Sequence, residues 1–193
     1  MDVDAPYLSV GQIEALARRI DRPLVLVGMM GVGKSTVGRK LAALLRFSFV
    51  DADEEIEGAA KMTIPEMFET YGETYFRDGE RRVIARLIHD AANAGGRVIA
   101  TGGGAFVDPE TRALILDEAI AIWLDCDVDT LVERVGRKGN RPLLRQGDPR
   151  EILTRLRDER APTYSAAPIR VESMHGPHQQ TAIRILQALD AAL

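Results

Sequence analysis

Gly28-Met29-Met30-Gly31-Val32-Gly33-Lys34-Ser35 is the stretch that decides the fold of this chain. It fits G-x-x-x-x-G-K-[ST], the pattern of a phosphate-binding loop (P-loop), in which glycines let the backbone turn its N–H groups around an anion. Residues 23–27 before it are apolar, and residues 36–45 after it carry Val37, Leu41, Leu44 and Leu45 at helical spacing. A buried strand, a glycine turn and a helix in this order predict a working phosphate site at a helix N-terminus.

The residue types of this stretch also predict which groups hold a nucleotide. We expect Lys34 to reach the β- and γ-phosphates of ATP and the Ser35 hydroxyl to ligate Mg²⁺. The predicted ATP-binding set is Gly28, Met29, Met30, Gly31, Val32, Gly33, Lys34, Ser35 and Thr36. The alternative is a tight turn that binds nothing, which the eight matching positions and their flanks disfavour.

Composition narrows the class of protein. A chain of 193 residues indicates one domain, or one with a lid, and a net charge of −4 gives no sign of a nucleic-acid binder. A single cysteine, Cys126, excludes an internal disulfide and favours a reducing compartment. The chain has no apolar run of membrane-spanning length, and its acidic start does not resemble a signal peptide. We therefore expect a cytoplasmic protein that binds neither membranes nor nucleic acid.

Two aspartates follow the second predicted strand, residues 47–50. If the strand continues, Asp51 and Asp53 lie on the same side, beyond the carboxyl end where open α/β sheets bind ligands. One carboxylate could then hold Mg²⁺, and the other could orient a hydroxyl or accept its proton. The alternative is that these acids only start a helix, where negative charge is favourable.

The third predicted strand, residues 97–100, runs into three consecutive glycines. Gly102, Gly103 and Gly104 allow close backbone approach, and we expect them to contact a ligand rather than to form only a flexible turn. The long helix predicted before this strand, residues 73–93, carries Arg77, Arg81, Arg82 and Arg86. One of these four, near the helix start, is a candidate to point into a pocket, but the spacing does not choose among them.

Residues 134–145 read R-V-G-R-K-G-N-R-P-L-L-R. Positive charge broken by glycine and proline favours a mobile lid that brings an arginine to the transferring phosphoryl group. We place this lid at about residues 136–149. The alternative is an exposed basic loop.

The remaining segments complete an alternating pattern. Strands are predicted at residues 119–125 and 169–172, a helix from residue 149 to Arg160 that ends before Pro162, and a last helix over residues 181–193. Residues 1–21 form an N-terminal extension in which Ile13, Leu16 and Ile20 line one face of a short helix. Three histidines, His89, His175 and His178, are expected on the surface or in loops. Five strands alternating with helices predict an α/β fold with a parallel sheet covered on both faces.

Several motifs together resemble the shikimate kinase family of small P-loop kinases. They are residues 28–35, F-V-D-A-D at 49–53, Y-F-R at 75–77, G-G-G at 102–104, R-P-L-L at 141–144 and R-A-P-x-Y at 160–164. The resemblance covers residues from Leu24 to the C-terminal helix. It implies a nucleoside-monophosphate-kinase-like fold and ATP-dependent phosphorylation of the 3-hydroxyl of shikimate, a step of chorismate and aromatic amino acid biosynthesis, with Mg²⁺ as cofactor and a monomeric enzyme.

The resemblance also implies residue roles. Asp51 is similar to the family's magnesium-side aspartate, and Asp53 to the one that binds the reacting hydroxyls. Arg77 and Arg160 resemble the pair that grips the shikimate carboxylate, with Gly103 and Gly104 as backbone contacts. Arg141 resembles the catalytic lid arginine, and Arg137 the one that packs on adenine. The family's adenine loop falls near residues 173–177, where this chain lacks the usual arginine.

Two rival functions stay open on the sequence. A gluconate-type or other small-metabolite kinase would share residues 28–35 but has no reason to carry the G-G-G and R-A-P-x-Y set with Asp53 and Arg77. A catalytically silent nucleotide-binding regulator is disfavoured because Lys34, Asp53 and the lid arginine are all present.

Overall fold

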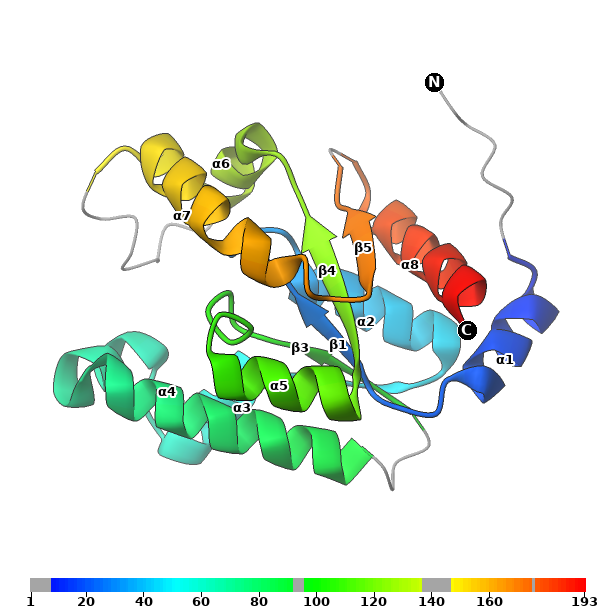
Figure 1. Ribbon diagram of the computed structural model, residues 1–193, viewed down its shortest axis with the longest axis horizontal. Helices are drawn as coiled ribbons and strands as arrows, with labels where there is room; N and C mark the ends of the chain where they lie inside the picture. The colour runs from blue at the N-terminus through cyan, green and yellow to red at the C-terminus, as the bar shows by residue number, and fades with distance from the viewer. Residues whose placement is uncertain (1–7, 92–95, 137–146, 175) are drawn as a thin grey trace.

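The computed structural model of the chain describes residues 8–91, 96–136, 147–174 and 176–193. Within these residues one sheet has five parallel strands in the order β2-β3-β1-β4-β5 (Figure 1). Along the chain the strands are β1 (Leu24–Val27), β2 (Ser48–Asp51), β3 (Arg97–Ala100), β4 (Ile120–Asp125) and β5 (Ile169–Glu172). The predicted fold class is confirmed.

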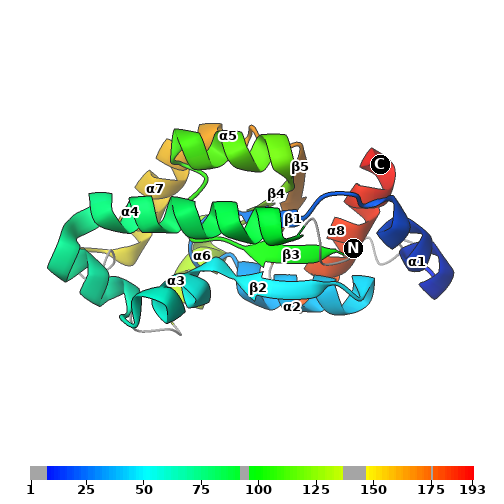
Figure 2. The ribbon, with the colours of Figure 1, turned by 90° about the horizontal axis from the view of Figure 1, so that it is seen from below.

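Helices cover both faces of the sheet, as a buried parallel sheet requires. They are α1 (Val10–Arg19), α2 (Lys34–Leu45), α3 (Ala52–Ala60), α4 (Ile64–Ala91), α5 (Pro109–Glu118), α6 (Val128–Gly136), α7 (Pro149–Tyr164) and α8 (His178–Ala192). Helices α4 and α5 lie on one face, whereas α2 and α8 pack against each other on the other (Figures 1 and 2). The central strands β1 and β4 are buried along their whole length.

The described part of the N-terminal extension forms the predicted helix. Ser9 caps α1 in a capping box with Gln12, which satisfies backbone N–H groups at the helix start. Leu16 is fully buried, Ile20 also joins the main core, and α1 contacts α2 and α8. The extension is therefore packed on the domain.

Helix α4 is interrupted at Gly72, just before the start of the long helix predicted from residue 73. The backbone there has φ 79° and ψ 175°, which separates two helical segments. The first segment begins with the side chains of Thr63 and Glu66 exchanging hydrogen bonds with each other's backbone N–H groups. The second segment runs to Ala91 and carries the four arginines.

The expected end of α7 before Pro162 is wrong. The helix continues through Pro162 to Tyr164, and Ser165 N still donates to Ala161 O at 2.9 Å. Proline lacks the N–H that would reach the carbonyl of Asp158, but both residues are exposed, so water can replace that one bond. The continued helix matters because it carries Tyr164 into the core.

In the part of the chain that the structure describes, no helix is both long and apolar enough to cross a membrane.

Candidate active site

The P-loop leaves the buried end of β1 and wraps toward α2. Gly28, Gly31 and Gly33 have φ values of 134°, 82° and 100°, which L side chains rarely adopt. Lys34 opens α2, and its Nζ donates to the carbonyls of Gly28 at 2.7 Å and Met29 at 2.9 Å. The loop therefore holds its own lysine at the helix N-terminus, where the partial positive charge favours phosphate.

One cleft brings together residues from five parts of the chain. Met30, Gly31, Gly33, Lys34, Ser35 and Thr36 come from the P-loop and the start of α2. The other walls are Asp51, Asp53, Thr101, Gly103, Arg134 and His178. The predicted phosphate, metal-side and hydroxyl-side residues thus share one cavity.

Asp51 and Asp53 reach this cleft by a different route from the one expected. Strand β2 ends at Asp51 and does not continue to Asp53, so strand alternation is not what places the pair. Asp51 instead caps α3, because its Oδ1 accepts the N–H of Asp53 at 3.1 Å. The two acids therefore start a helix and also line the P-loop cleft, and their roles there stay predictions.

The donor set suits magnesium. A hydroxyl from Ser35 and a carboxylate from Asp51 line the same cleft, and Mg²⁺ is commonly held by one or two such groups together with phosphates and water. Among the described residues there is no cluster of three or more His, Cys, Asp or Glu side chains that could hold a metal. An ion bound here would therefore depend on the phosphates for the rest of its ligands.

The glycine turn after β3 lies against two acids, the P-loop backbone and Arg77. A Cβ on Gly102 would lie 2.8 Å from Glu80 Oε1 and 2.9 Å from Asp53 Oδ1. A Cβ on Gly103 would lie 3.1 Å from Met30 N of the P-loop. On Gly104 it would lie 2.6 Å from both terminal nitrogens of Arg77. None of the three has a positive φ, so close packing, not backbone freedom, explains the glycines.

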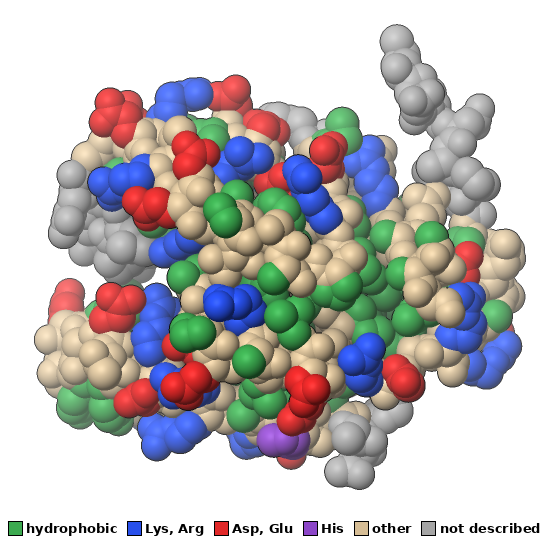
Figure 3. Space-filling view, in the orientation of Figure 1, with side chains coloured by type: hydrophobic (Ala, Val, Ile, Leu, Met, Phe, Trp, Pro, Cys, Tyr) green, Lys and Arg blue, Asp and Glu red, His purple; other side chains and the backbone are tan. Residues whose placement is uncertain are grey.

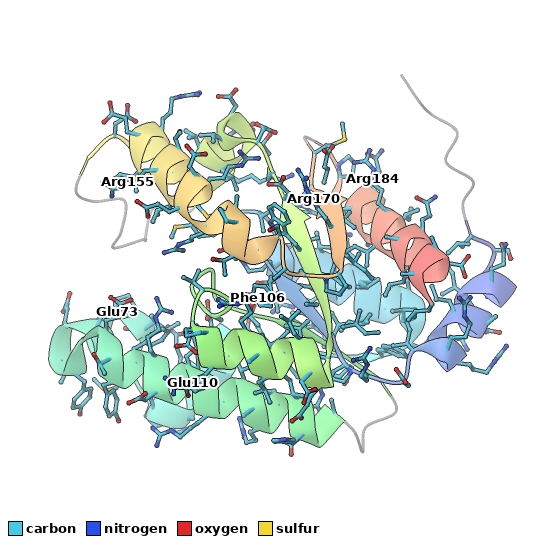
Figure 4. All side chains as sticks on the ribbon, in the orientation of Figure 1. Glu73, Phe106, Glu110, Arg155, Arg170 and Arg184 are labelled. Atoms are coloured by element: carbon cyan, nitrogen blue, oxygen red, sulfur yellow. The ribbon has the colours of Figure 1, made fainter. Side chains whose placement is uncertain are left out.

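Arg77 is the α4 arginine whose guanidinium lies against the glycine turn, at Gly104. It donates to Glu80 Oε2 at 2.6 Å and to Glu73 Oε1 at 3.1 Å, and Glu73 is labelled in Figure 4. Burial lowers the pKa of Arg77, but its ion pairs, chiefly with Glu80, leave that pKa above its ordinary value. Two of the other arginines pair outside the site, Arg81 with Glu110 and Arg86 with Glu55.

Glu80 is a site residue that the sequence analysis missed. Its side chain is almost fully buried, and burial raises its pKa, although Arg77 opposes that shift. The second carboxylate oxygen, Oε1, has no hydrogen-bond partner in the described structure. The i, i+3 spacing from Arg77 was the available signal, because side chains three apart share a helix face.

Arg160 reaches the same turn from α7, whereas Arg77 reaches it from α4. Its Nη1 donates to Gly103 O at 3.3 Å, and the Tyr164 hydroxyl donates to the same carbonyl. The Tyr164 ring stacks between Phe106, labelled in Figure 4, and Trp123, and burial raises the pKa of its hydroxyl. In the space-filling view the surface is hollowed between α4 and α7, with Lys and Arg side chains beside the hollow (Figure 3).

Two further residues line the cleft although the sequence did not predict them there. Arg134, which opens the basic stretch, belongs to α6 and donates to Val32 O at 2.9 Å, Ser173 Oγ at 3.0 Å and Met174 O at 2.9 Å. His178 was expected on the surface or in a loop, but it begins α8 and lies half-buried against Gly33, whose Cβ would be 2.9 Å from the ring. Neither place follows from local sequence, because both depend on how α6 and α8 pack beside the P-loop.

Three expectations fall outside the described residues. Arg137 and Arg141 belong to residues 137–146, which also make up most of the expected lid, and His175 is likewise not described. The roles of the two arginines stay predictions.

Residues 30–190 match the family model for shikimate kinase. The shikimate kinase of Novosphingobium aromaticivorans is 68% identical over 98% of this chain and 98% of its own, and that of Bradyrhizobium diazoefficiens is 50% identical over 100% and 91%.

A solved structure of a shikimate kinase is also similar to this chain. The shikimate kinase of Acinetobacter baumannii in complex with shikimate has a TM-score of 0.83 and 36% identity, covering 91% of this chain and 98% of that one. A gluconokinase from Sinorhizobium meliloti covers 90% and 95%, with a TM-score of 0.54 but only 17% identity, so it shares the fold alone.

The raised pKa of Glu80 predicts a pH-dependent stability. An acid whose pKa is higher in the folded state stabilises the fold at low pH, and that stabilisation is lost as the pH rises through the folded-state pKa. Relative to Glu80→Gln, the free energy of unfolding of the parent protein should fall as the pH rises above 4.5, the ordinary value for this group. Urea denaturation of both proteins across a pH series measures the difference, and a rise with pH would mean that attraction to Arg77 outweighs burial.

Proposed function

The chain belongs to the shikimate kinase family, and from this premise we infer that it transfers the γ-phosphoryl group of ATP to the 3-hydroxyl of shikimate. The products are shikimate 3-phosphate and ADP. The observation that carries the inference is the convergence on one glycine turn: the P-loop, Asp53, Arg77 and Arg160 all meet residues 102–104.

On the nucleotide side, we assign the phosphates to the P-loop N–H groups and Lys34. Lys34 would exchange its loop carbonyls for phosphate oxygens when ATP binds, since both kinds of acceptor lie within reach of one ammonium group. Ser35 and Asp51 would hold Mg²⁺, which supplies charge neutralisation at the phosphates. Arg134 and His178 line the same cleft and are further candidates to contact the nucleotide.

On the acceptor side, Arg77 and Arg160 would hold the shikimate carboxylate beside the glycine turn, which they reach from α4 and α7. Guanidinium groups grip a planar carboxylate in a fixed orientation, which a single ammonium cannot do. Glu80 and Glu73 orient Arg77 in advance, and the Gly103 carbonyl orients Arg160. The ring of the acceptor is thereby set with one hydroxyl toward the P-loop, and such positioning is most of what phosphoryl transfer requires.

The chemical step then needs little beyond this alignment. The 3-hydroxyl oxygen attacks the γ-phosphorus, the bond to the β–γ bridging oxygen breaks, and the hydroxyl loses its proton. Asp53 would orient that hydroxyl and accept the proton, because its carboxylate lies against Gly102 on the cleft wall. We further propose that the enzyme acts as a cytoplasmic monomer, with residues 22–193 as the kinase domain and residues 1–21 as an extension.

The direct test is acceptor-dependent release of ADP. The purified protein with MgATP should turn over with shikimate and show only background release with gluconate or no acceptor. Turnover with gluconate would discard the acceptor assignment while keeping the nucleotide site. No turnover in any tube, with ATP still bound in a separate titration, would favour a silent nucleotide-binding protein.

Removing the Arg160 side chain should strongly lower kcat/KM for shikimate. In Arg160→Ala, Arg77 alone remains to bind the shikimate carboxylate. We therefore expect a loss of about 3 kcal/mol of transition-state stabilisation, roughly a hundredfold in kcat/KM for shikimate. Arg155→Ala, an exposed change on the same helix, is the matched control. Near-normal kcat/KM in Arg160→Ala would refute the assignment.

A further inference from the structure

A buried acid at the end of β4 holds two arginines. Asp125 is the last residue of the strand and is only 6% exposed. Its carboxylate accepts hydrogen bonds from Cys126 N at 2.9 Å, from Arg157 Nη2 at 3.3 Å and from Arg170 Nη2 at 2.7 Å. This cluster lies outside the cleft, and no step of the reaction uses it.

One of the two arginines is enough to neutralise the acid. Arg170, on the edge strand β5 and labelled in Figure 4, makes the shorter bond to Asp125, and its guanidinium lies 4.8 Å from the centroid of the Trp123 ring. A buried carboxylate is costly unless it is paired, and Arg170 supplies that pairing. Arg157 is therefore not required for charge balance, and its contacts call for another explanation.

The contacts of Arg157 fix a position rather than a charge. Besides Asp125, its Nε donates to the Cys126 carbonyl at 3.1 Å, so one guanidinium holds two successive residues at the end of β4. The planar fork of arginine gives such a double contact a defined direction. Helix α7 is thereby attached to the strand that lies beside the P-loop strand β1.

Arg160 lies on the same helix face as this anchor. Arg157, Arg160 and Tyr164 are spaced i, i+3 and i+7, which places them along one stripe of α7. Arg157 holds the stripe to the end of β4, and Tyr164 holds it to the Gly103 carbonyl. The proposed substrate arginine is thus held between two fixed points, one on each side.

The end of β4 is itself fixed relative to the nucleotide site. A Cβ on Gly28 would lie 2.4 Å from the Leu124 carbonyl, so the P-loop begins directly against β4. The Asp125 carbonyl also accepts Ser173 N at 2.6 Å, and Ser173 bonds to Val32 of the P-loop. An anchor at this point therefore fixes the position of α7 relative to the P-loop.

We propose that Arg157, held by Asp125 and the Cys126 carbonyl, is a positioning residue that places Arg160 for the carboxylate of the acceptor. The inference rests on the proposed function, in which Arg160 grips that carboxylate. The Asp125–Arg157 pair then links the acceptor side of the site to the strand that supports the P-loop.

The test separates positioning from general stability. In Arg157→Gln, Asp125 keeps its bond to Arg170, so the fold should persist and only the placement of α7 should loosen. Because Arg77 still holds the carboxylate and Asp53 the hydroxyl in this variant, a looser Arg160 weakens shikimate binding more than it disturbs the transfer step, so KM rises while kcat changes little. We expect KM for shikimate to rise about tenfold, with kcat and KM for MgATP within about twofold of the parent values.

Two variants on α7 serve as controls. Arg155→Gln removes an exposed arginine of the same helix, labelled in Figure 4, and should leave all three constants unchanged. Arg157→Lys restores the charge but not the double contact, and should recover only part of the shikimate KM. If Arg157→Gln does not fold, Arg157→Lys carries the test, with a raised shikimate KM as the expected result.

The possible results distinguish a failure of the positioning role of Arg157 from a failure of the proposed function. A shikimate KM equal to that of Arg155→Gln, or equal losses in kcat and in MgATP affinity, would overturn the positioning role. If Arg160→Ala collapses kcat/KM while Arg157→Gln behaves as the control, the proposed function stands and this inference fails. If Arg160→Ala is itself near normal, both fail.

Discussion

The packing of Gly102, Gly103 and Gly104 against the rest of the site is the constraint on which the arrangement depends. Each glycine leaves room for a different partner: the acids Asp53 and Glu80, the P-loop backbone, and the Arg77 guanidinium. The Gly103 carbonyl in turn accepts bonds from α7. A side chain on this turn would push apart groups that must meet for a phosphoryl group to pass between two substrates.

The parallel sheet explains why these groups can meet at all. Strands β1, β2 and β3 are neighbours, and their carboxyl ends deliver the P-loop, Asp51 and the glycine turn to one edge. Helices α4 and α7 then bring one arginine each to that edge: Glu80 fixes how Arg77 points, and the Gly103 carbonyl accepts a bond from Arg160. The buried carboxylates of Glu80 and Asp125 are tolerated because each is paired with arginine.

The sequence predicted which residues follow the strands better than it predicted which side chains contact each other. The P-loop, Asp51, Asp53 and the glycine triplet were found because each follows a recognisable strand, so local pattern and sheet geometry suffice. Glu80, Tyr164 and His178 were missed because their roles depend on packing between distant elements. The predicted end of α7 before Pro162 was wrong, because a proline at an exposed position removes only one hydrogen bond, which water can replace.

The most direct test of the account is Gly104→Ala. Its added methyl group would lie 2.6 Å from the end of the flexible Arg77 side chain and not against backbone, so Arg77 should move while the fold stays intact. The account predicts an unchanged midpoint of thermal unfolding and an unchanged KM for MgATP, with KM for shikimate raised about tenfold or more. Unchanged shikimate kinetics in a normally folded Gly104→Ala protein would contradict the claim that this turn sets the acceptor site.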